Sequence, residues 1–478
     1  MIHQASSGRS YDPLVEMQTI FRVMKAAHGE DINPDYKARR DRLMRLEQTL
    51  LAFTDRLMAA MMKDFGHRSP AESGNFDITL LLGDIRMNRD KMKEWMRPRS
   101  YAIPKHLLPA RGRVIPQPKG VVGVIAPWNF PVYMAISPVA AALAAGNRVM
   151  VKPSELTPHT SDVIKAMIEA VFDPREVAVS IGGVDVAQAF SSLAFDHILF
   201  TGSTQVGRQV AVAAAKNLTP VTLELGGKSP AIVGKKADLA YAAKRIAYGK
   251  TANGGQICVA PDYALVPRGQ MERFVREVEK AMHKFFPDFT QSQDYTAIIS
   301  DRHRARLQSM VEEAEGRGAK VKRLADCSQA ACRIEAPTLL IDPPLDIKAM
   351  EEEIFGPILP IIPYDTIDEA MAFVSERPAP LSLYIFTDND KERDIWLGGS
   401  LSGGVCVNEV CFHVAADTLP FGGVGESGMG AYHGQAGFET FSHMKSVLYQ
   451  PKLNGTFLFN PPISGFQRYA AKILRKII

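Results

Sequence analysis

One cysteine of this chain lies beside a flexible turn, where its side chain could act as a nucleophile. Cys258 belongs to the stretch NGGQICVAP (residues 253–261), behind Gly254 and Gly255 and ahead of apolar residues. The chain has only five cysteines among 478 residues, and a buried structural thiol has no need of glycines beside it. Free cysteines are most often inert core residues, so on this residue alone that alternative stays open.

Two further side chains could complete the chemistry of a thiol attacking a carbonyl carbon. Such chemistry needs a thiolate, a donor that stabilises the oxyanion, and a base for the second step. Asn129, expected to be exposed with Trp128 between two prolines, and Glu224 each follow a short apolar run. They offer an amide donor and a carboxylate base to Cys258. No His or Cys spacing is typical of a metal site, so none is predicted.

The elements that must position these residues are predicted from the alternation of apolar runs and helical stretches. From Gly120 to about residue 225, runs such as GVVGVIA, HILF and VTLE close on Gly, Pro or a polar residue, and helical stretches separate them. This pattern predicts a parallel sheet covered on both faces, with ligands bound at the carboxyl ends of its strands. A second alternating region over about 230–415 predicts another α/β unit.

Gly202, Ser203 and Gly207 form a candidate phosphate-binding turn. They lie in TGSTQVG (residues 201–207), directly after a predicted strand, where a helix N-terminus offers free backbone N–H groups. The stretch lacks the middle glycine of the dinucleotide fingerprint, so an ordinary strand-to-helix turn remains an alternative. Glu224 follows at about the spacing of that fingerprint's ribose-binding acid. Because Cys258 chemistry needs a base, we interpret Glu224 as that base and not as a ribose contact.

The two ends of the chain differ from its middle. Residues 1–100 carry apolar side chains at helical spacing and predict two or three helices. Prolines over residues 101–119 predict an extended connector or an edge hairpin. The closing stretch FQRYAAKILRKII (residues 466–478) forms a basic amphipathic helix that is too short to span a bilayer. We expect it to dock on its own or a neighbouring subunit; peripheral membrane contact is the less favoured alternative.

Composition excludes several classes of protein. The charge is nearly balanced, with 56 basic and 52 acidic residues, and gives no reason to expect nucleic acid. An odd number of cysteines does not make a disulfide framework and favours a reducing compartment. The start MIHQASSGRSYDP has no apolar segment typical of a secretory signal, and no run of about 18 apolar residues exists. We therefore expect a cytoplasmic protein.

Seven motifs, in order, resemble those of the aldehyde dehydrogenase superfamily. The flanking stretch FETFSHMKSVL is most similar to the class 3 branch, and RVIPQPKGVVGVIAPWN is similar to the bacterial coniferyl aldehyde dehydrogenases near that branch. The motifs span residues 127–434 and read PWNFP, VKPSE, FTGST, LELGGKSP, GQICVAPDY, EEEIFGP and PFGGVGESGMGAYHG.

The resemblance implies a fold and a domain organisation. It predicts the α/β fold of aldehyde dehydrogenases, with a Rossmann-type parallel-sheet domain for NAD(P) over residues 1–100 and 120–225. A second α/β domain, the catalytic domain, is expected over residues 226–418. A small bridging and oligomerisation element would combine residues 101–119 with 445–478, and a homodimer is the expected assembly.

The resemblance also implies catalytic roles. Cys258 matches the nucleophile that forms a thiohemiacetal and then a thioester. Asn129, with the backbone N–H of Cys258, matches the oxyanion hole, and Glu224 matches the base that activates water. Glu353 comes close to the reactive centre in this family, so a shared base role stays open.

The implied cofactor is NAD, with NADP as the alternative. A carboxylate at Glu155 would favour the free 2′-hydroxyl of NAD and repel the 2′-phosphate of NADP, although enzymes similar to this branch accept both. Trp128 could border the cofactor crevice or be a core indole. The implied cofactor contacts are Trp128, Lys152, Glu155, Gly202, Ser203, Gly207, Glu353 and Phe355.

The resulting hypothesis is NAD(P)-dependent oxidation of an aldehyde to a carboxylic acid. We expect Phe130, Tyr133, Phe412 and Phe421 to line a hydrophobic tunnel, which suits an aromatic substrate such as coniferaldehyde or a medium- to long-chain aliphatic one. The main alternative is a cysteine thioesterase or esterase without redox chemistry, which the cofactor elements disfavour. Glu224, which recruits water, disfavours transfer of the acyl group to coenzyme A or phosphate.

Overall fold

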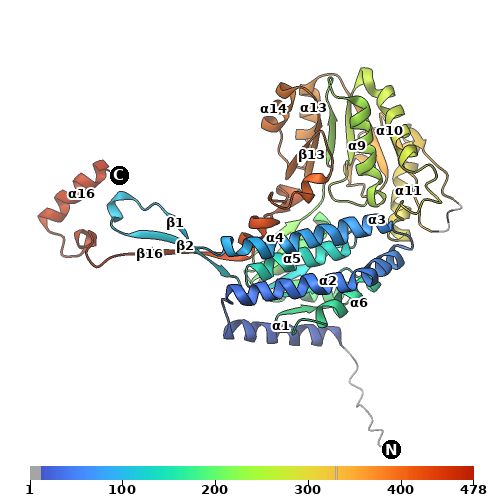
Figure 1. Ribbon diagram of the computed structural model, residues 1–478. Coiled ribbons are helices and arrows are strands. Elements are labelled where there is room, and N and C mark those ends of the chain that lie inside the picture. The colour runs from blue at the N-terminus through green and yellow to red at the C-terminus, as the bar shows by residue number, and fades with distance from the viewer. Residues whose placement is uncertain (1–11, 329, 331, 478) are drawn as a thin grey trace, which may run out of the picture.

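The computed structural model describes residues 12–328, 330 and 332–477 (Figure 1). Over these residues the strands form three sheets, of six, seven and three strands. The first eleven residues, in which we expected no secretory signal, and residue 478, the last of the predicted amphipathic tail, lie outside the described residues.

The six-stranded sheet has the order β15-β7-β6-β3-β4-β5. Its strands are parallel except β15, which pairs antiparallel with β7. All residues of β3, β4 and β6 are buried, as apolar strands covered on both faces require. The strands are β3 (Val121–Ile125), β4 (Arg148–Lys152), β5 (Val177–Val179), β6 (His197–Thr201), β7 (Val221–Glu224) and β15 (Gly428–Met429).

Helices cover both faces of this sheet. Val122 and Val124 of β3 pack in one core cluster with α2, α4, α5 and α6, whereas Val121 and Ile125 pack in another with α1, α7 and α8. This alternation follows from the two-residue period of a strand. The helices are α1 (Pro13–Glu30), α2 (Tyr36–Phe65), α3 (Pro70–Glu72), the π-helix η1 (Ser73–Thr79), α4 (Leu80–Trp95), α5 (Pro131–Ala144), α6 (Pro158–Glu169), α7 (Val184–Ser191), α8 (Thr204–Ala215) and α15 (Gly434–Thr440).

The seven-stranded sheet forms a second α/β unit with the order β10-β11-β12-β9-β8-β13-β14. Its strands are β8 (Pro230–Val233), β9 (Tyr263–Pro267), β10 (Lys320–Arg323), β11 (Thr338–Ile341), β12 (Ile358–Tyr364), β13 (Ser382–Phe386) and β14 (Gly404–Val407). Residues of α9 and α10 pack on one face, and residues of α11, α13 and α14 on the other. The helices are α9 (Leu239–Thr251), α10 (Met271–Phe285), α11 (Asp301–Gly316), α12 (Lys348–Glu351), α13 (Ile367–Ser375) and α14 (Asp390–Gly399).

The three-stranded sheet forms an arm that extends from the two α/β units (Figure 1). It pairs β1 (Arg99–Tyr101), β2 (Arg111–Pro118) and β16 (Ser442–Tyr449), all antiparallel. At its far end lies α16 (Gly465–Ile477), well away from both units in Figure 1. Phe466 and Tyr469 of α16 are exposed. The expected docking of this segment on its own subunit is therefore wrong, because Phe466, Tyr469 and Ile473 meet solvent in this chain.

The predicted α/β fold with parallel sheets is confirmed. The hairpin expected in the proline-containing stretch is present as β1 and β2, and the N-terminal part is helical from Pro13. Over the described residues, no helix has both the length and the apolar character needed to cross a bilayer.

Candidate active site

A sharp turn after α9 positions Cys258. Three successive residues of this turn, Asn253, Gly254 and Gly255, have positive φ values of 49°, 61° and 73°. A Cβ on Gly255 would lie 2.5 Å from the carbonyl oxygen of Gly356, so this position needs glycine for space as well as for conformation. The turn reverses the chain and brings Cys258 to the wall of a cavity.

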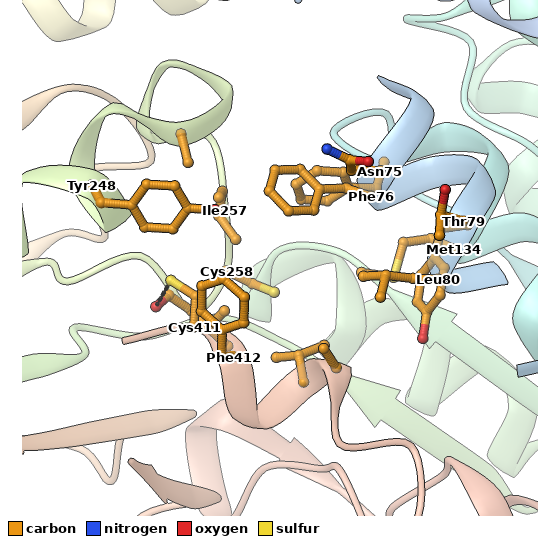
Figure 2. Close-up of a pocket in the computed structure, with 16 residues that line it drawn as sticks. Asn75, Phe76, Thr79, Leu80, Met134, Tyr248, Ile257, Cys258, Cys411 and Phe412 are labelled. Carbon is orange, nitrogen blue, oxygen red and sulfur yellow. Dashed lines mark hydrogen bonds between the residues drawn. The ribbon is translucent and has the colours of Figure 1, made fainter. Parts of the chain in front are cut away.

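This cavity has a volume of about 410 Å³ and a mostly apolar lining. Figure 2 shows the Cys258 side chain pointing into it, between a wall with Tyr248 and Phe412 and an opposite wall with Leu80 and Met134. Tyr248 and Phe412 are stacked with their ring centres 5.9 Å apart. The other lining residues are Asn75, Phe76, Thr79, Phe130, Tyr133, Ala252, Ile257, Val259, Cys411, Val414 and Ala415.

The structure places Phe130, Tyr133 and Phe412 in the cavity wall, but not Phe421. The expectation for Phe421 is wrong because its backbone pairs with that of Tyr432 and its ring stacks on His433, with 5.3 Å between ring centres. This pairing buries Phe421 outside the cavity lining.

Asn129 follows β3 and is only 3% exposed, so the expectation that it is exposed is wrong. Its Nδ2 donates a hydrogen bond of 3.1 Å to the carbonyl oxygen of Gln256, two residues before Cys258. An amide NH2 group has two hydrogens, and the second one can serve an oxygen of a substrate. The bond to Gln256 thus fixes the amide beside the cysteine turn.

Glu224 ends β7 and is 2% exposed. Neither of its carboxylate oxygens has a hydrogen-bond partner among the described residues, and burial raises its pKa well above the ordinary value. Its backbone is held firmly, since β7 pairs with β6 and β15 and its carbonyl accepts from Gly202 N at 3.0 Å. A buried carboxylate with a raised pKa is suited to take a proton from water.

Glu353 provides a second carboxylate near the same centre. A Cβ on Gly226 would overlap its carboxylate oxygens, so the two residues are in close contact. Burial, with the charge of Asp262 nearby, raises the pKa of Glu353 to about 8. Burial and the charges of Glu353 and Glu224 also raise the pKa of Cys258. The resting thiol is therefore protonated, and its proton must leave before the sulfur can attack.

Lys152 and Glu155 form an ion pair at the carboxyl end of β4. Lys152 is 1% exposed, and its Nζ lies 2.7 Å from Oε2 of Glu155. Partial burial alone would raise the pKa of Glu155, but the hydrogen bond from Lys152, a backbone hydrogen bond and the charges of Lys152 and Arg302 together outweigh burial, and the pKa is lowered. The carboxylate is therefore charged and partly exposed at an edge where parallel sheets bind ligands.

The predicted phosphate-binding turn lies at the start of α8. Ser203 is its N-cap and accepts from Val206 N at 3.4 Å, and this turn is accessible to solvent. A Cβ on Gly207 would lie 2.6 Å from Leu225 Cδ2, so glycine lets the helix pack closely on the sheet. Gly202 precedes the cap, and Oγ1 of Thr201 is buried without a partner among the described residues. These features fit a dinucleotide pyrophosphate.

Trp128 and Phe355 lie together, half-buried, with 5.3 Å between ring centres. Trp128 also contacts His303 edge to face at 5.2 Å. The indole is therefore not sealed in the core. Over the described ranges, no group of three or more His, Cys, Asp or Glu side chains is arranged to hold a metal ion.

A buried polar group behind the cavity was not predicted from the sequence. It comprises Arg68, Glu72 and Asp77 from the segment after α2, with Asn253 and Gln256 of the cysteine turn. The one feature of the sequence that could have indicated this group is the placement of two acidic residues among small ones in SPAESGNFD (residues 69–77). The same pattern is equally typical of a solvent-exposed helix start.

Comparison with known proteins decides the family. Residues 16–447 match the family model described as "Aldehyde dehydrogenase family". The chain belongs to the aldehyde dehydrogenase family. It is therefore an oxidoreductase that acts on aldehydes. It is 46% identical over 470 residues to the "Probable coniferyl aldehyde dehydrogenase" of Caulobacter vibrioides, covering 96% of this chain and 97% of the relative.

Two solved aldehyde dehydrogenases share this architecture. One, described as the substrate-bound state of Staphylococcus aureus AldH, has a TM-score of 0.91 and 36% identity, and the match covers 96% of this chain and 99% of that one. The other is indole-3-acetaldehyde dehydrogenase crystallised with NAD+, with a TM-score of 0.84, 26% identity and coverage of 92% and 89%. The aldehyde dehydrogenase fold expected from the motifs is confirmed.

Proposed function

We propose that this aldehyde dehydrogenase oxidises a neutral aromatic aldehyde of the coniferaldehyde type to its carboxylic acid, with NAD as the preferred oxidant and Cys258 as the nucleophile. The observation that carries the proposal is the position of Cys258 in an aromatic-walled cavity, with the Asn129 amide fixed beside its turn. The relative from Caulobacter vibrioides, described as "Probable coniferyl aldehyde dehydrogenase", supports the substrate class.

The first bond forms between the sulfur of Cys258 and the carbonyl carbon of the aldehyde. The thiol proton first passes to solvent through one of the two neighbouring carboxylates, Glu224 or Glu353; the thiolate then attacks, and the carbonyl oxygen becomes the oxyanion of a thiohemiacetal. Nδ2 of Asn129 and the backbone N–H of Cys258 are the proposed donors to this oxyanion. One such donor commonly changes kcat by 10²–10³-fold, because it acts where charge develops in a water-poor site.

The cofactor fits the carboxyl edge of the six-stranded sheet. Lys152 and Glu155 would hold the adenosine ribose, and the turn of Gly202 and Ser203 before α8 would hold the pyrophosphate. A bound nicotinamide would supply the hydride acceptor for the substrate carbon. Glu353 of the seven-stranded unit would bind the nicotinamide ribose. We thus assign most of the cofactor contacts to the first unit, and the nucleophile and the Glu353 contact to the second.

Glu224 is the proposed base for release of the acid. After oxidation the substrate carbon stays bonded to Cys258 as a thioester. Glu224 accepts a proton from water, the hydroxyl oxygen attacks the thioester carbon, and the carbon–sulfur bond breaks to return Cys258. The unpartnered oxygens and raised pKa of Glu224 support this role. The raised pKa of Glu353 also suits a base, so the two carboxylates must be compared directly.

The cavity lining favours flat, uncharged substrates. None of its described lining residues is Asp, Glu, Lys or Arg. Rings of Phe76, Phe130, Tyr133, Tyr248 and Phe412 surround the space, and aromatic rings stack offset or edge to face with gains of about 0.5–1.5 kcal/mol per pair. A conjugated ring joined to the aldehyde would meet these walls better than a short or charged chain.

A substrate panel with a nucleophile variant tests the proposal. Purified enzyme is given NAD with coniferaldehyde, benzaldehyde, hexanal or hexadecanal, and NADH formation is followed by absorbance. We expect the highest kcat/KM with coniferaldehyde and a loss of at least about 10³-fold in Cys258→Ala. Full activity in that variant would refute the nucleophile. Ester hydrolysis without any aldehyde oxidation would instead favour the thioesterase alternative.

The arm and α16 are the proposed dimer contact. Large apolar side chains are exposed on β16, on α16 and on the segment between them, namely Leu448, Tyr449, Phe457, Phe459, Phe466 and Tyr469. Exposed apolar side chains gathered on one projecting part of a chain commonly mark an interaction site, and a second copy of the chain would bury them. Light scattering of the eluting full-length protein should give twice the chain mass. A monomer that co-sediments with anionic vesicles would favour membrane contact instead.

A nucleophilic thiol and four more free cysteines support a reducing compartment such as the cytoplasm.

A further inference from the structure

A fully buried ion pair lies directly behind Asn129. Nη2 of Arg68 is 2.8 Å from Oδ2 of Asp77, and both side chains are 0% exposed. Nη1 of the same guanidinium donates to the backbone carbonyl of Asn129 at 2.9 Å. Neither charged residue lines the cavity, so neither can touch a substrate there.

Asp77 extends this contact to the helix that follows Asn129. Its Oδ1 accepts from the backbone N–H groups of Val132 and Tyr133, both at 3.1 Å, in the first turn of α5. Negative charge at a helix N-terminus is favourable because the helix dipole is positive there. Arg68 and Asp77 thus hold the residue itself and the start of the next helix.

The same carbonyl is bound from the cysteine turn. Nδ2 of Asn253 donates at 3.1 Å to the carbonyls of both Asn129 and Gln256. The backbone N–H of Asn253 in turn donates to Glu72 Oε1 at 2.8 Å. Asn129 is therefore fixed by Arg68 on one side and by the cysteine turn on the other.

Asp77 also belongs to the π-helix η1, which supplies Asn75, Phe76 and Thr79 to the cavity wall. π-Helical turns are rare in proteins, and those that occur often lie at functional sites. One ion pair therefore joins the element that forms part of the substrate wall to the backbone of Asn129.

Stability alone does not explain a buried ion pair. Removing two charges from water costs several kcal/mol per ion, and apolar replacements of similar volume are often neutral or stabilising. Arg68 is 0% exposed, and its guanidinium donates to a carboxylate and a backbone carbonyl. Such an arginine is suited to fix the position of the backbone that it binds.

We propose that Arg68 and Asp77 are positioning residues that set the location of the Asn129 amide for the oxyanion. This inference rests on the oxyanion role given to Asn129 under Proposed function. Displacement of a reacting group by about 1 Å can cost on the order of 10²-fold in rate. Loss of the pair should lower kcat and leave KM nearly unchanged, because neither side chain is part of the cavity lining.

The test removes both charges together and keeps the acceptor that α5 needs. In the Arg68→Met/Asp77→Asn enzyme, the new amide oxygen can still accept from Val132 and Tyr133, and neither partner of the ion pair is left as a lone charge. We expect kcat with coniferaldehyde to fall about 10- to 100-fold and KM to change by less than about threefold. Arg68→Lys keeps the positive charge but loses the two-pronged guanidinium, so kcat should fall less than in the double variant. This single variant provides the test if the double variant does not fold.

A double-mutant cycle with Asn129→Ala separates positioning from general destabilisation. If Arg68 and Asp77 act through Asn129, their replacement should cost little further rate once the amide is gone. The matched control is Arg39→Lys, since Arg39 is equally buried but bonds to the backbone carbonyls of Pro34 and Ala144. Its kcat should remain within about twofold of wild type.

The outcomes divide cleanly. A folded Arg68→Met/Asp77→Asn enzyme with wild-type kcat, or losses that simply multiply with that of Asn129→Ala, overturns the inference and leaves the proposed function standing. An unimpaired Asn129→Ala enzyme overturns the oxyanion role itself. A large loss in the double variant that disappears in the Asn129→Ala background supports the inference.

Discussion

Lys152 holds the carboxylate of Glu155 at 2.7 Å, at the point where β4 ends. The lysine is buried, whereas 40% of the Glu155 side chain is exposed. The pair therefore presents one charged carboxylate to whatever binds along this edge of the sheet. Under the proposed cofactor arrangement, this carboxylate faces a ribose hydroxyl and determines whether a phosphate is tolerated there.

Replacement of Glu155 should change cofactor preference. In Glu155→Gln, the repulsion between the carboxylate and a 2′-phosphate is removed, and the amide can still bond to a hydroxyl. We expect the ratio of kcat/KM for NADP to kcat/KM for NAD to rise by about tenfold or more, which corresponds to roughly 1.4 kcal/mol. Steady-state kinetics with both cofactors measure it. An unchanged ratio would mean that Glu155 does not face the ribose.

The two carboxylates near Cys258 should differ in the step that they serve. Glu224→Gln should keep a burst of NADH in the first turnover but lose about 10²–10³-fold in steady-state rate, because only release of the acid needs the base. Glu353→Gln should instead lose the burst rate. Rapid-mixing absorbance distinguishes the two. A full steady-state rate with a normal thioester lifetime in Glu224→Gln would transfer the base role to Glu353.

The raised pKa of Glu353 predicts a pH dependence of stability. Its pKa is about 8 in the folded protein, against about 4.3 in an unfolded chain. The folded state therefore holds a proton that the unfolded state has lost between these values, and stability falls as pH rises. The contribution is fully present below about pH 4.3 and is lost as pH passes about 8. Glu353→Gln should flatten the decline in Tm over this window in thermal melts, whereas the exposed Glu312→Gln should retain it.

Gly226 is predicted to set the position of Glu353. A Cβ on Gly226 would overlap the Glu353 carboxylate, and a flexible carboxylate can swing away at little cost. Gly226→Ala should therefore reproduce most of the kinetic loss of Glu353→Gln with little change in Tm. The combined variant should be no slower than Glu353→Gln alone. Losses that multiply in the combined variant would show that Gly226 acts elsewhere, for example on Glu224.

Much of the candidate site was predictable because parallel sheets place their strand ends together. Asn129, Lys152 and Glu224 each follow an apolar run, and they lie at the carboxyl ends of β3, β4 and β7. The glycines before Cys258 likewise predicted a turn, which the positive φ values bear out. These signals are local, so a single sequence contains them.

The rest depended on contacts between distant segments. Arg68 lies among polar residues that look like a solvated helix connection, and its bond to Asn129 spans 61 positions. Phe421 was expected in the cavity because it is aromatic, but a backbone bridge to Tyr432 turns it away. Hydrophobic pattern does not specify such pairings, since they depend on how separate elements dock.

The last strands of the chain complete sheets that its earlier segments began. β15 pairs with β7, and β16 pairs with β2, although the whole seven-stranded unit lies between them in sequence order. During translation, β7, which ends in Glu224, therefore lacks its β15 partner and forms an unpaired sheet edge until the ribosome has made the second unit. Premature release of the nascent chain would leave that edge free to pair with other chains, so a shortened product should aggregate rather than retain partial activity.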